Sequence, residues 1–216
     1  MEALAGTRPS GFAVVDVETT GFCPGSERIV ELGVVLLDGE GVEVEAFATL
    51  LDPGCDPGPT HIHGISGPMV DGAPTFPTVH PFLAEQLSGR VLVGHNVDQF
   101  DLAFLREECR RTGGAGLVPG SVPTIDTLTV AQYHLGLRGR ARLVDCCGYF
   151  GLSWLDHHSA LADARVTAAL FGLMRGRLGD EALGLSRLQA EAAASAWPGA
   201  SGLTPAIRGR ADARVG

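Results

Sequence analysis

The chain has 216 residues, 45% of them hydrophobic, which is enough for one sizeable α/β core. Its formal net charge of −9 at pH 7 argues against a protein that coats long duplexes, because that binding depends on basic side chains neutralising phosphates. No apolar stretch has the length of a membrane span and the first residues lack a secretory pattern, so we expect a cytoplasmic protein.

Three β-rich segments open the sequence and predict paired strands. They are residues 11–18, 28–39 and 42–53. The letters DGEG between the second and third segments are typical of a hairpin turn. We therefore expect these two strands to be antiparallel neighbours.

Helices and strands alternate after a connection that is rich in Pro and Gly. The expected elements are a helix near 78–88, a strand at 90–96, a helix near 98–112, a strand in PTIDTLTV (123–130), and helices near 142–150 and 158–176. A meander followed by strands that helices separate predicts an α/β fold, with helices covering a mixed sheet.

The boundaries of the folded part follow from composition. We expect an N-terminal extension at 1–10, one folded domain at 11–176 and a helical extension at 177–195. Residues 196–216 are rich in Gly, Pro, Ala and Arg without apolar periodicity, and this composition predicts a flexible tail.

Two acids stand at the end of the first predicted strand, in FAVVDVETTG (12–21). Side chains alternate along a strand, so Asp16 and Glu18 share a face with Phe12 and Val14. Neighbouring buried carboxylates repel each other and lose hydration, which is costly unless a cation or hydrogen-bond donors compensate. A strand end that opens into solvent would also account for them.

The segment GHNVDQFDLAFL (94–105) places another acid near a packed helical face. Asp101 lies at the margin of the stripe formed by Phe100 and Phe104. Asp98 is three residues earlier and could face the same way, although it also suits the N-terminus of the helix as a cap. Both acids are candidates, and the apolar register favours Asp101.

The segment HHSALADARVTAALF (157–171) carries Asp163 beside an apolar helical face. His158 precedes it by five positions, a helical rotation of about 140°, so the two cannot project alike from one regular helix. We expect His158 on the preceding loop or first turn. That accessible position suits a group that removes a proton from water.

Taken together, these segments resemble a known family. D-x-E-T-T-G, then H-N followed by F-D-x-x-F-L, then H-x-x-x-x-D are similar to the three exonuclease motifs of the DEDDh group. This group contains the DnaQ-like relatives of the DNA polymerase III epsilon proofreading subunit. The resemblance covers roughly residues 11–175, and IHGISGPMVDGAPTF, VLVGHN and IDTLTVAQ stand in family-like order. One departure is VDQ (97–99), which lengthens the usual spacing after H-N.

The resemblance implies a ribonuclease H-like fold with a mixed five-stranded sheet, and hydrolysis at the 3′ end of nucleic acid, with single-stranded DNA as the expected substrate. It implies two divalent cations, Mg²⁺ or Mn²⁺, bound by Asp16, Glu18, Asp101 and Asp163, with His158 as general base. A polymerase or repair protein is an expected partner. The residues expected to touch the terminal nucleotide are Thr19, Thr20, Phe22, His63, Asn96 and Phe100.

Several alternatives stay open at this point. His63 could be a loop histidine bonded to backbone, and Thr19 and Thr20 could serve only the turn. The whole chain could be an oligoribonuclease-like RNA exonuclease, or a module that keeps the fold without cleaving. The presence of every expected ligand type favours an enzyme.

Overall fold

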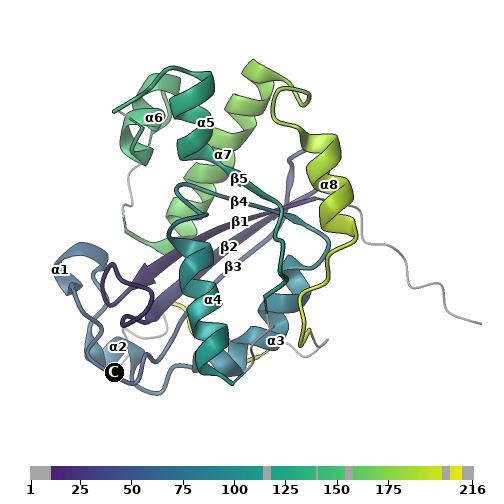
Figure 1. The fold of residues 1–216 in the computed structure, drawn as a ribbon. Helices are drawn as coiled ribbons and strands as arrows, with labels where there is room; N and C mark the ends of the chain where they lie inside the picture. Colours follow the sequence, from purple (N-terminus) through teal and green to yellow (C-terminus); the bar gives the residue numbers. More distant parts are fainter. Residues whose placement is uncertain (1–10, 114–117, 140, 154–157, 201–204, 211–216) are drawn as a thin grey trace, which may run out of the picture.

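The computed structural model describes residues 11–113, 118–139, 141–153, 158–200 and 205–210. Five strands form one sheet in the order β3-β2-β1-β4-β5 (Figure 1). They are β1 (Phe12–Thr19), β2 (Ile29–Leu37), β3 (Glu43–Leu50), β4 (Val91–Gly94) and β5 (Thr124–Asp126). β1, β2 and β3 pair antiparallel, whereas β4 runs parallel to β1 and β5. The predicted hairpin and mixed sheet are confirmed.

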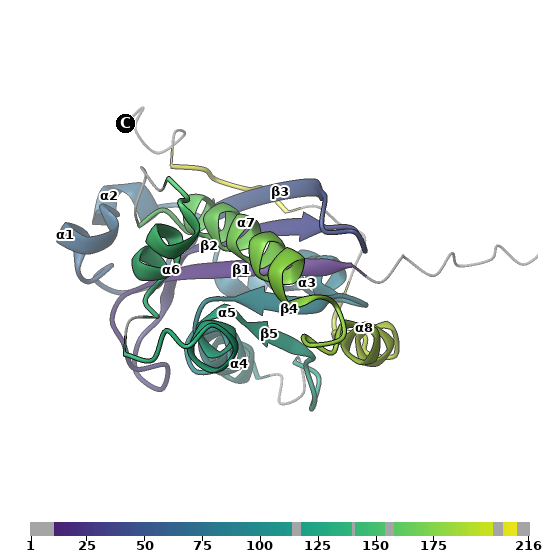
Figure 2. The same ribbon diagram turned by 90° about the horizontal axis from the view of Figure 1, so that it is seen from above.

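Helices lie on both faces of the sheet. They are α1 (Thr60–His63), α2 (Gly67–Val70), α3 (Phe76–Leu87), α4 (Asp101–Arg111), α5 (Thr127–His134), α6 (Leu143–Phe150), α7 (Ala160–Leu178) and α8 (Leu185–Ala193). Figure 2 shows α7 lying across the strands. Among the described helices, none combines the length and hydrophobicity that crossing a bilayer requires.

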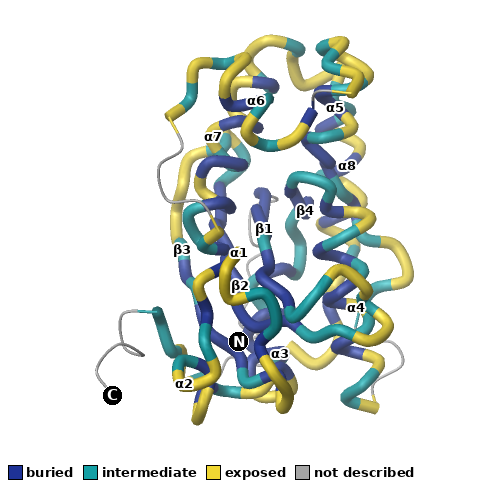
Figure 3. Tube along the Cα trace, turned by 90° about the vertical axis from the view of Figure 1, so that its left-hand side faces the viewer, coloured by how far each residue is buried: buried dark blue, intermediate teal, exposed yellow. Residues whose placement is uncertain are grey.

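The core divides into two layers because side chains alternate along β1. Ala13, Val15 and Val17 pack in the layer that includes side chains of α3 and α4. Phe12 and Val14 face the other layer, which includes side chains of α7. Figure 3 shows the central strands as buried and the outer surfaces of the helices as exposed. The predicted alternation therefore places Asp16 on the α7 side of the sheet.

Two local predictions were wrong. The segment predicted as one strand at 123–130 is a strand only to Asp126, whose side chain accepts hydrogen bonds from the N–H groups of Leu128 and Thr129 and so starts α5. Asp98 does not cap α4, because the helix begins at Asp101 after Phe100 and has no side-chain cap. In the first case a capping aspartate overrode the β-rich composition that follows it.

The chain after α8 packs back on the domain in two places. Trp197 is buried, and its backbone N–H donates to Ser88 Oγ at 2.9 Å. Further on, the Leu50 N–H at the end of β3 donates to the Arg208 carbonyl at 2.8 Å. Figure 2 shows residues 205–210 as a yellow trace that runs outside β3 toward α2.

Candidate active site

The two acids of β1 lie where the first residue of α7 packs tightly against the sheet. Gly33 pairs with Asp16 across the β1–β2 ladder. A Cβ atom at Gly33 would lie 2.3 Å from the carbonyl carbon of Ala160, the first residue of α7. Only glycine allows this contact, which brings the start of α7 over Asp16 and places Asp163 near Asp16 and Glu18.

Asp101 reaches the same place from the other side of β1. It is buried as the first residue of α4, and its Oδ1 accepts a hydrogen bond from the Val17 N–H at 3.0 Å. The longer spacing before Phe100 is absorbed in a turn that starts at Asn96, whose φ is +67°. Asp98 is exposed in that turn. The geometry therefore joins Asp101, and not Asp98, to the strand end.

His158 lies just before α7, outside the regular helix, as its spacing from Asp163 predicts. It is exposed and has a φ of +64°, and its N–H donates to Asp163 Oδ2 at 3.3 Å. One possible ligand atom from each of Glu18, His158 and Asp163 lies within 4.8 Å of the others. The three residues thus form a compact acidic and imidazole group.

Burial and the charges of neighbouring acids raise the pKa values of Asp16, Glu18 and Asp101. The pKa of Asp16 is raised well above its usual value by burial and then by the charges of Asp101 and Asp163. Burial, with the charges of Asp163 and Glu31, raises the pKa of Glu18 to about 8. Burial raises the pKa of Asp101 to about 7, although N–H groups bonded to it act in the opposite direction.

These observations test whether the residues fit a metal ion. Carboxylate oxygens are the ligands that hard divalent cations prefer. Several buried carboxylates that raise one another's pKa create a local excess of negative charge, which a cation would offset. The group of Glu18, His158 and Asp163, with Asp16 and Asp101 beside it, is therefore suited to hold a metal.

A pocket of about 190 Å³ adjoins this group. The sequence-predicted residues that line it are Glu18, Thr19, Phe22, His63, Phe100 and His158. Phe22 is 80% exposed at the pocket, which is unusual for a phenylalanine. Pro59 and Ile62 also line the pocket, and sequence analysis did not single them out. Apolar and aromatic side chains thus stand directly beside the acids.

The loop between β1 and β2 carries Phe22 and is held by internal hydrogen bonds. Thr19 Oγ1 donates to the Gly21 carbonyl at 2.6 Å, and the Thr20 N–H donates to the Arg28 carbonyl at 2.9 Å. The Thr20 hydroxyl donates to Glu27 and accepts from the Arg28 N–H. The N–H and the hydroxyl of Thr20 both form hydrogen bonds within the loop, which supports a role for Thr20 in the turn.

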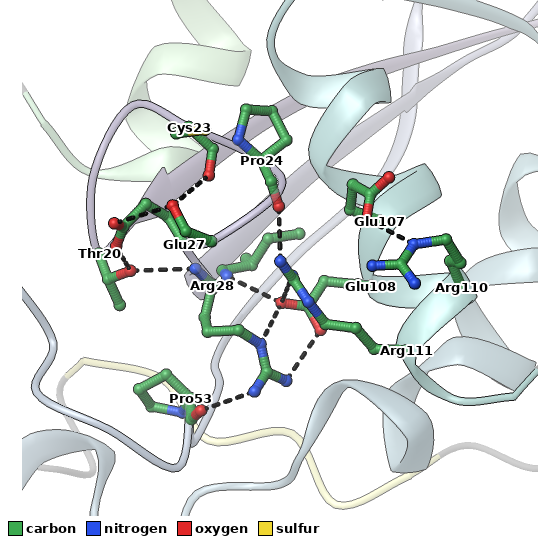
Figure 4. Close-up of polar contacts among 12 residues, drawn as sticks. Thr20, Cys23, Pro24, Glu27, Arg28, Pro53, Glu107, Glu108, Arg110 and Arg111 are labelled. Carbon is green, nitrogen blue, oxygen red and sulfur yellow. Dashed lines mark hydrogen bonds and ion pairs between the residues drawn. The ribbon is translucent and has the colours of Figure 1, made fainter.

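A buried carboxylate fastens this loop to α4 (Figure 4). Glu108 is 1% exposed and accepts two hydrogen bonds from Arg28, at 2.7 and 2.9 Å, and one from Arg111 at 3.3 Å. Arg111 also donates to the Pro24 carbonyl at 2.6 Å. Such bidentate contacts fix direction as well as distance, so the base of the Phe22 loop is rigidly placed.

The remaining predicted residues lie in different surroundings. His63 is buried at the pocket, its Nδ1 accepts a hydrogen bond from the Ile65 N–H at 3.0 Å, and burial lowers its pKa. The Asn96 N–H donates to Asp126 Oδ1 at 2.9 Å, which ties the turn after β4 to the end of β5. Asn96 is half-buried and does not line the pocket.

Sequence analysis missed Glu31 and Arg210. Glu31 is 2% exposed, pairs with Glu18 across the ladder and accepts from the Ala160 N–H at 2.9 Å. An acid in the apolar run RIVELGVVLL was a readable signal for it. Arg210 forms a bidentate ion pair with Glu31, at 2.7 and 2.8 Å, from a segment whose composition gives no such signal.

Comparison with known proteins gives consistent results. The family model RNase T, described as an exonuclease, matches residues 13–171. The DNA polymerase III subunit epsilon of Treponema pallidum is 34% identical over 170 residues, which is 76% of this chain and 75% of the relative. The PolC-type DNA polymerase III of Clostridium perfringens is 33% identical over 161 residues, 74% of this chain. The match spans 11% of that polymerase's length.

The fold has close structural relatives. The crystal structure of E. coli Exonuclease I in complex with a dT13 oligonucleotide matches with a TM-score of 0.69 and 21% identity, over 80% of this chain and 43% of that chain. This likeness confirms the ribonuclease H-like fold. Family match, relatives and fold agree, and the chain therefore belongs to the RNase T/DnaQ-like exonuclease family, with resemblance to polymerase III epsilon subunits and PolC exonuclease domains.

Proposed function

We propose that this chain is a metal-dependent 3′–5′ exonuclease that hydrolyses phosphodiester bonds at the 3′ end of single-stranded DNA. One observation carries the proposal: acids from β1, α4 and α7 converge beside His158 and an aromatic pocket. Acids on three distant segments have no structural need to meet, and the raised pKa values of Asp16, Glu18 and Asp101 mark a cost that a functional ion would offset.

We infer that Asp16, Glu18, Asp101 and Asp163 hold two divalent cations, Mg²⁺ or Mn²⁺. When bound, such a pair supplies an activated water and stabilises the attacking and leaving oxygens of the phosphodiester. Asp101 is already oriented by the Val17 N–H, and Asp163 by the His158 N–H. These fixed carboxylates would present their oxygens without further reorganisation.

His158 has the role of general base in this proposal. It is exposed, so water reaches its ring, and it stands within 4.8 Å of atoms of Glu18 and Asp163. An imidazole side chain can accept the proton of an attacking water near neutral pH. Its backbone bond to Asp163 keeps the ring near the reacting centre.

The pocket would receive the terminal nucleotide. Phe22 and Phe100 offer apolar faces on which a base can stack, an interaction worth about 1–3 kcal/mol per base. Burial lowers the pKa of His63, which favours the neutral imidazole at the pocket wall. Thr19 lies at the same wall, with its hydroxyl turned to the Gly21 carbonyl.

Wild-type protein with 5′-labelled and 3′-labelled single strands of DNA and RNA tests the proposal. With Mg²⁺ or Mn²⁺, 5′-labelled DNA should yield a ladder of shortening products, and 3′-labelled DNA should release a labelled mononucleotide. Internal cuts, or activity undiminished by EDTA, would refute it. If RNA were cleaved faster than DNA, the proposed substrate would be short RNA and not DNA. DNA binding without cleavage would favour a non-cleaving module.

The relatives also suggest where the activity acts. The names of these relatives are DNA polymerase III subunit epsilon and DNA polymerase III PolC-type. We propose that this chain works in the cytoplasm on 3′ ends, in association with a polymerase or a repair protein. Co-purification with a polymerase subunit from cells at native expression would support this association.

A further inference from the structure

One guanidinium group joins the two segments that border the pocket. Arg210 Nη2 donates to the His158 carbonyl at 2.7 Å, and Arg210 Nη1 donates to the His63 carbonyl at 2.8 Å. His63 and His158 both line the pocket beside Glu18. The segments that carry His63 and His158 are far apart in sequence, and the two hydrogen bonds from Arg210 fix the distance between them.

Glu31 anchors this guanidinium from within the sheet. Arg210 Nε and Nη2 donate to the two carboxylate oxygens of Glu31 at 2.7 and 2.8 Å, and the Glu31 side chain is 3% exposed. Glu31 also accepts from the Ala160 N–H, the first residue of α7. A paired and fully hydrogen-bonded buried charge of this kind has a fixed position.

The backbone of His158 needs such support. Its φ of +64° is left-handed, a strained conformation for a non-glycine residue that persists only where the surroundings enforce it. Its N–H is held by Asp163 and its carbonyl by Arg210. Two side chains, of Asp163 and Arg210, therefore hold the peptide groups before and after the His158 Cα.

Residues 205–210 reach this place by pairing with the edge of the sheet. The Arg208 carbonyl accepts from the Leu50 N–H at 2.8 Å, and the Arg208 N–H donates to Thr49 Oγ1 at 3.2 Å. Arg208 also donates from its side chain to the Asp71 carbonyl. Residues 205–210 themselves lie outside residues 13–171, the part of the chain matched by the family model.

We propose that residues 205–210 complete the active site and that Arg210 is a positioning residue for His158. This inference rests on the proposed exonuclease function. Arg210 acts through the His158 carbonyl, and by holding His63 it also keeps the pocket wall in place. The planar fork of arginine donates to Glu31 and to both carbonyls together, which the point charge of lysine cannot reproduce.

Turnover measurements on the full chain test this role. Arg210→Ala should lower kcat by about 10–10²-fold, the effect of misplacing a catalytic group by about 1 Å, with a smaller change in KM. Arg210→Lys keeps the positive charge beside Glu31, but its kcat should still fall by most of the factor expected for Arg210→Ala. Arg187→Ala is the matched control, since it removes an arginine whose exposed ion pair is with Glu191 on α8, and it should turn over as wild type.

A double-mutant cycle separates positioning from general destabilisation. If Arg210 acts through His158, then Arg210→Ala should reduce kcat very little once His158→Ala is present. Fully multiplicative losses would overturn the proposal, as would wild-type kcat in both Arg210 variants. Melting curves verify that each variant is folded at the assay temperature, and Arg210→Lys carries the cycle if Arg210→Ala is not.

An NMR measurement tests the inference without catalysis. With ring-labelled histidine, the His158 signal should shift or broaden in Arg210→Ala, while that of exposed His134 should stay unchanged. An unchanged His158 signal would overturn the positioning role. If the wild type cleaves no nucleic acid but the His158 signal responds, the exonuclease proposal fails and the positioning role stands.

Discussion

Removal of divalent cations should make the protein lose stability as the pH rises from 5 to 8. The reason is the acid cluster: burial and neighbouring charges raise the pKa of Glu18 from 4.5 to about 8. Between these values the folded protein keeps a proton that the unfolded chain has released. Unfolding therefore releases protons, and the free energy of unfolding falls with rising pH across this window.

The size of the effect follows from the pKa of Glu18. A change from 4.5 to about 8, at about 1.4 kcal/mol per unit, is worth on the order of a few kcal/mol. Asp16 and Asp101 have raised pKa values as well and act in the same direction. A bound divalent cation replaces the proton as compensation, so stabilisation by Mn²⁺ should be larger at pH 8 than at pH 5.

Urea unfolding in EDTA and in Mn²⁺, at several pH values, measures this linkage. Glu18→Gln should flatten the pH dependence in EDTA and weaken stabilisation by Mn²⁺. Asp98→Asn removes an exposed acid outside the cluster and should behave as wild type. Stability in EDTA that is constant or rises between pH 5 and 8, or Mn²⁺ stabilisation that Glu18→Gln does not reduce, would refute the reasoning.

The other predictions concern single residues of the site. His158→Ala should lower kcat by about 10²–10⁴-fold, and calorimetry should show that Mn²⁺ binding is largely kept. If Mn²⁺ binding were lost together with activity, His158 would be a metal ligand or a structural residue. Asp101→Asn should abolish cleavage, whereas Asp98→Asn should leave most activity. An inactive Asp98→Asn together with a nearly normal Asp101→Asn would show that Asp98 is the metal ligand. Gly33→Ala should lower the melting temperature and activity together because its Cβ meets Ala160; a wild-type melting temperature would contradict this.

Much of the fold follows from local patterns in the sequence. The alternation along β1 places Asp16 and Glu18 correctly, and the DGEG turn gives the hairpin of β2 and β3. The Phe100 and Phe104 stripe favours Asp101 over Asp98, and Asp101 is the acid that accepts a hydrogen bond from the Val17 N–H at the strand end. These features depend on neighbours within a few residues, and such neighbours are visible in the sequence.

The missed features depend on contacts between distant segments. Glu31 reads as an isolated acid until its pairing with Glu18 is known, although its place in an apolar strand was informative. Arg210 is 179 positions from Glu31, and nothing in the composition of its segment marks it. The capping by Asp126 was missed because the residues after it favour strands as strongly as helices.

Cleavage of a 5′-labelled single-stranded DNA by wild type and Asp16→Asn, with Mg²⁺ and with EDTA, tests the central claim most directly. We predict stepwise shortening from the 3′ end by wild type with Mg²⁺, and none with EDTA or with folded Asp16→Asn. Equal shortening by Asp16→Asn, or by wild type in EDTA, would contradict an active site built on these carboxylates.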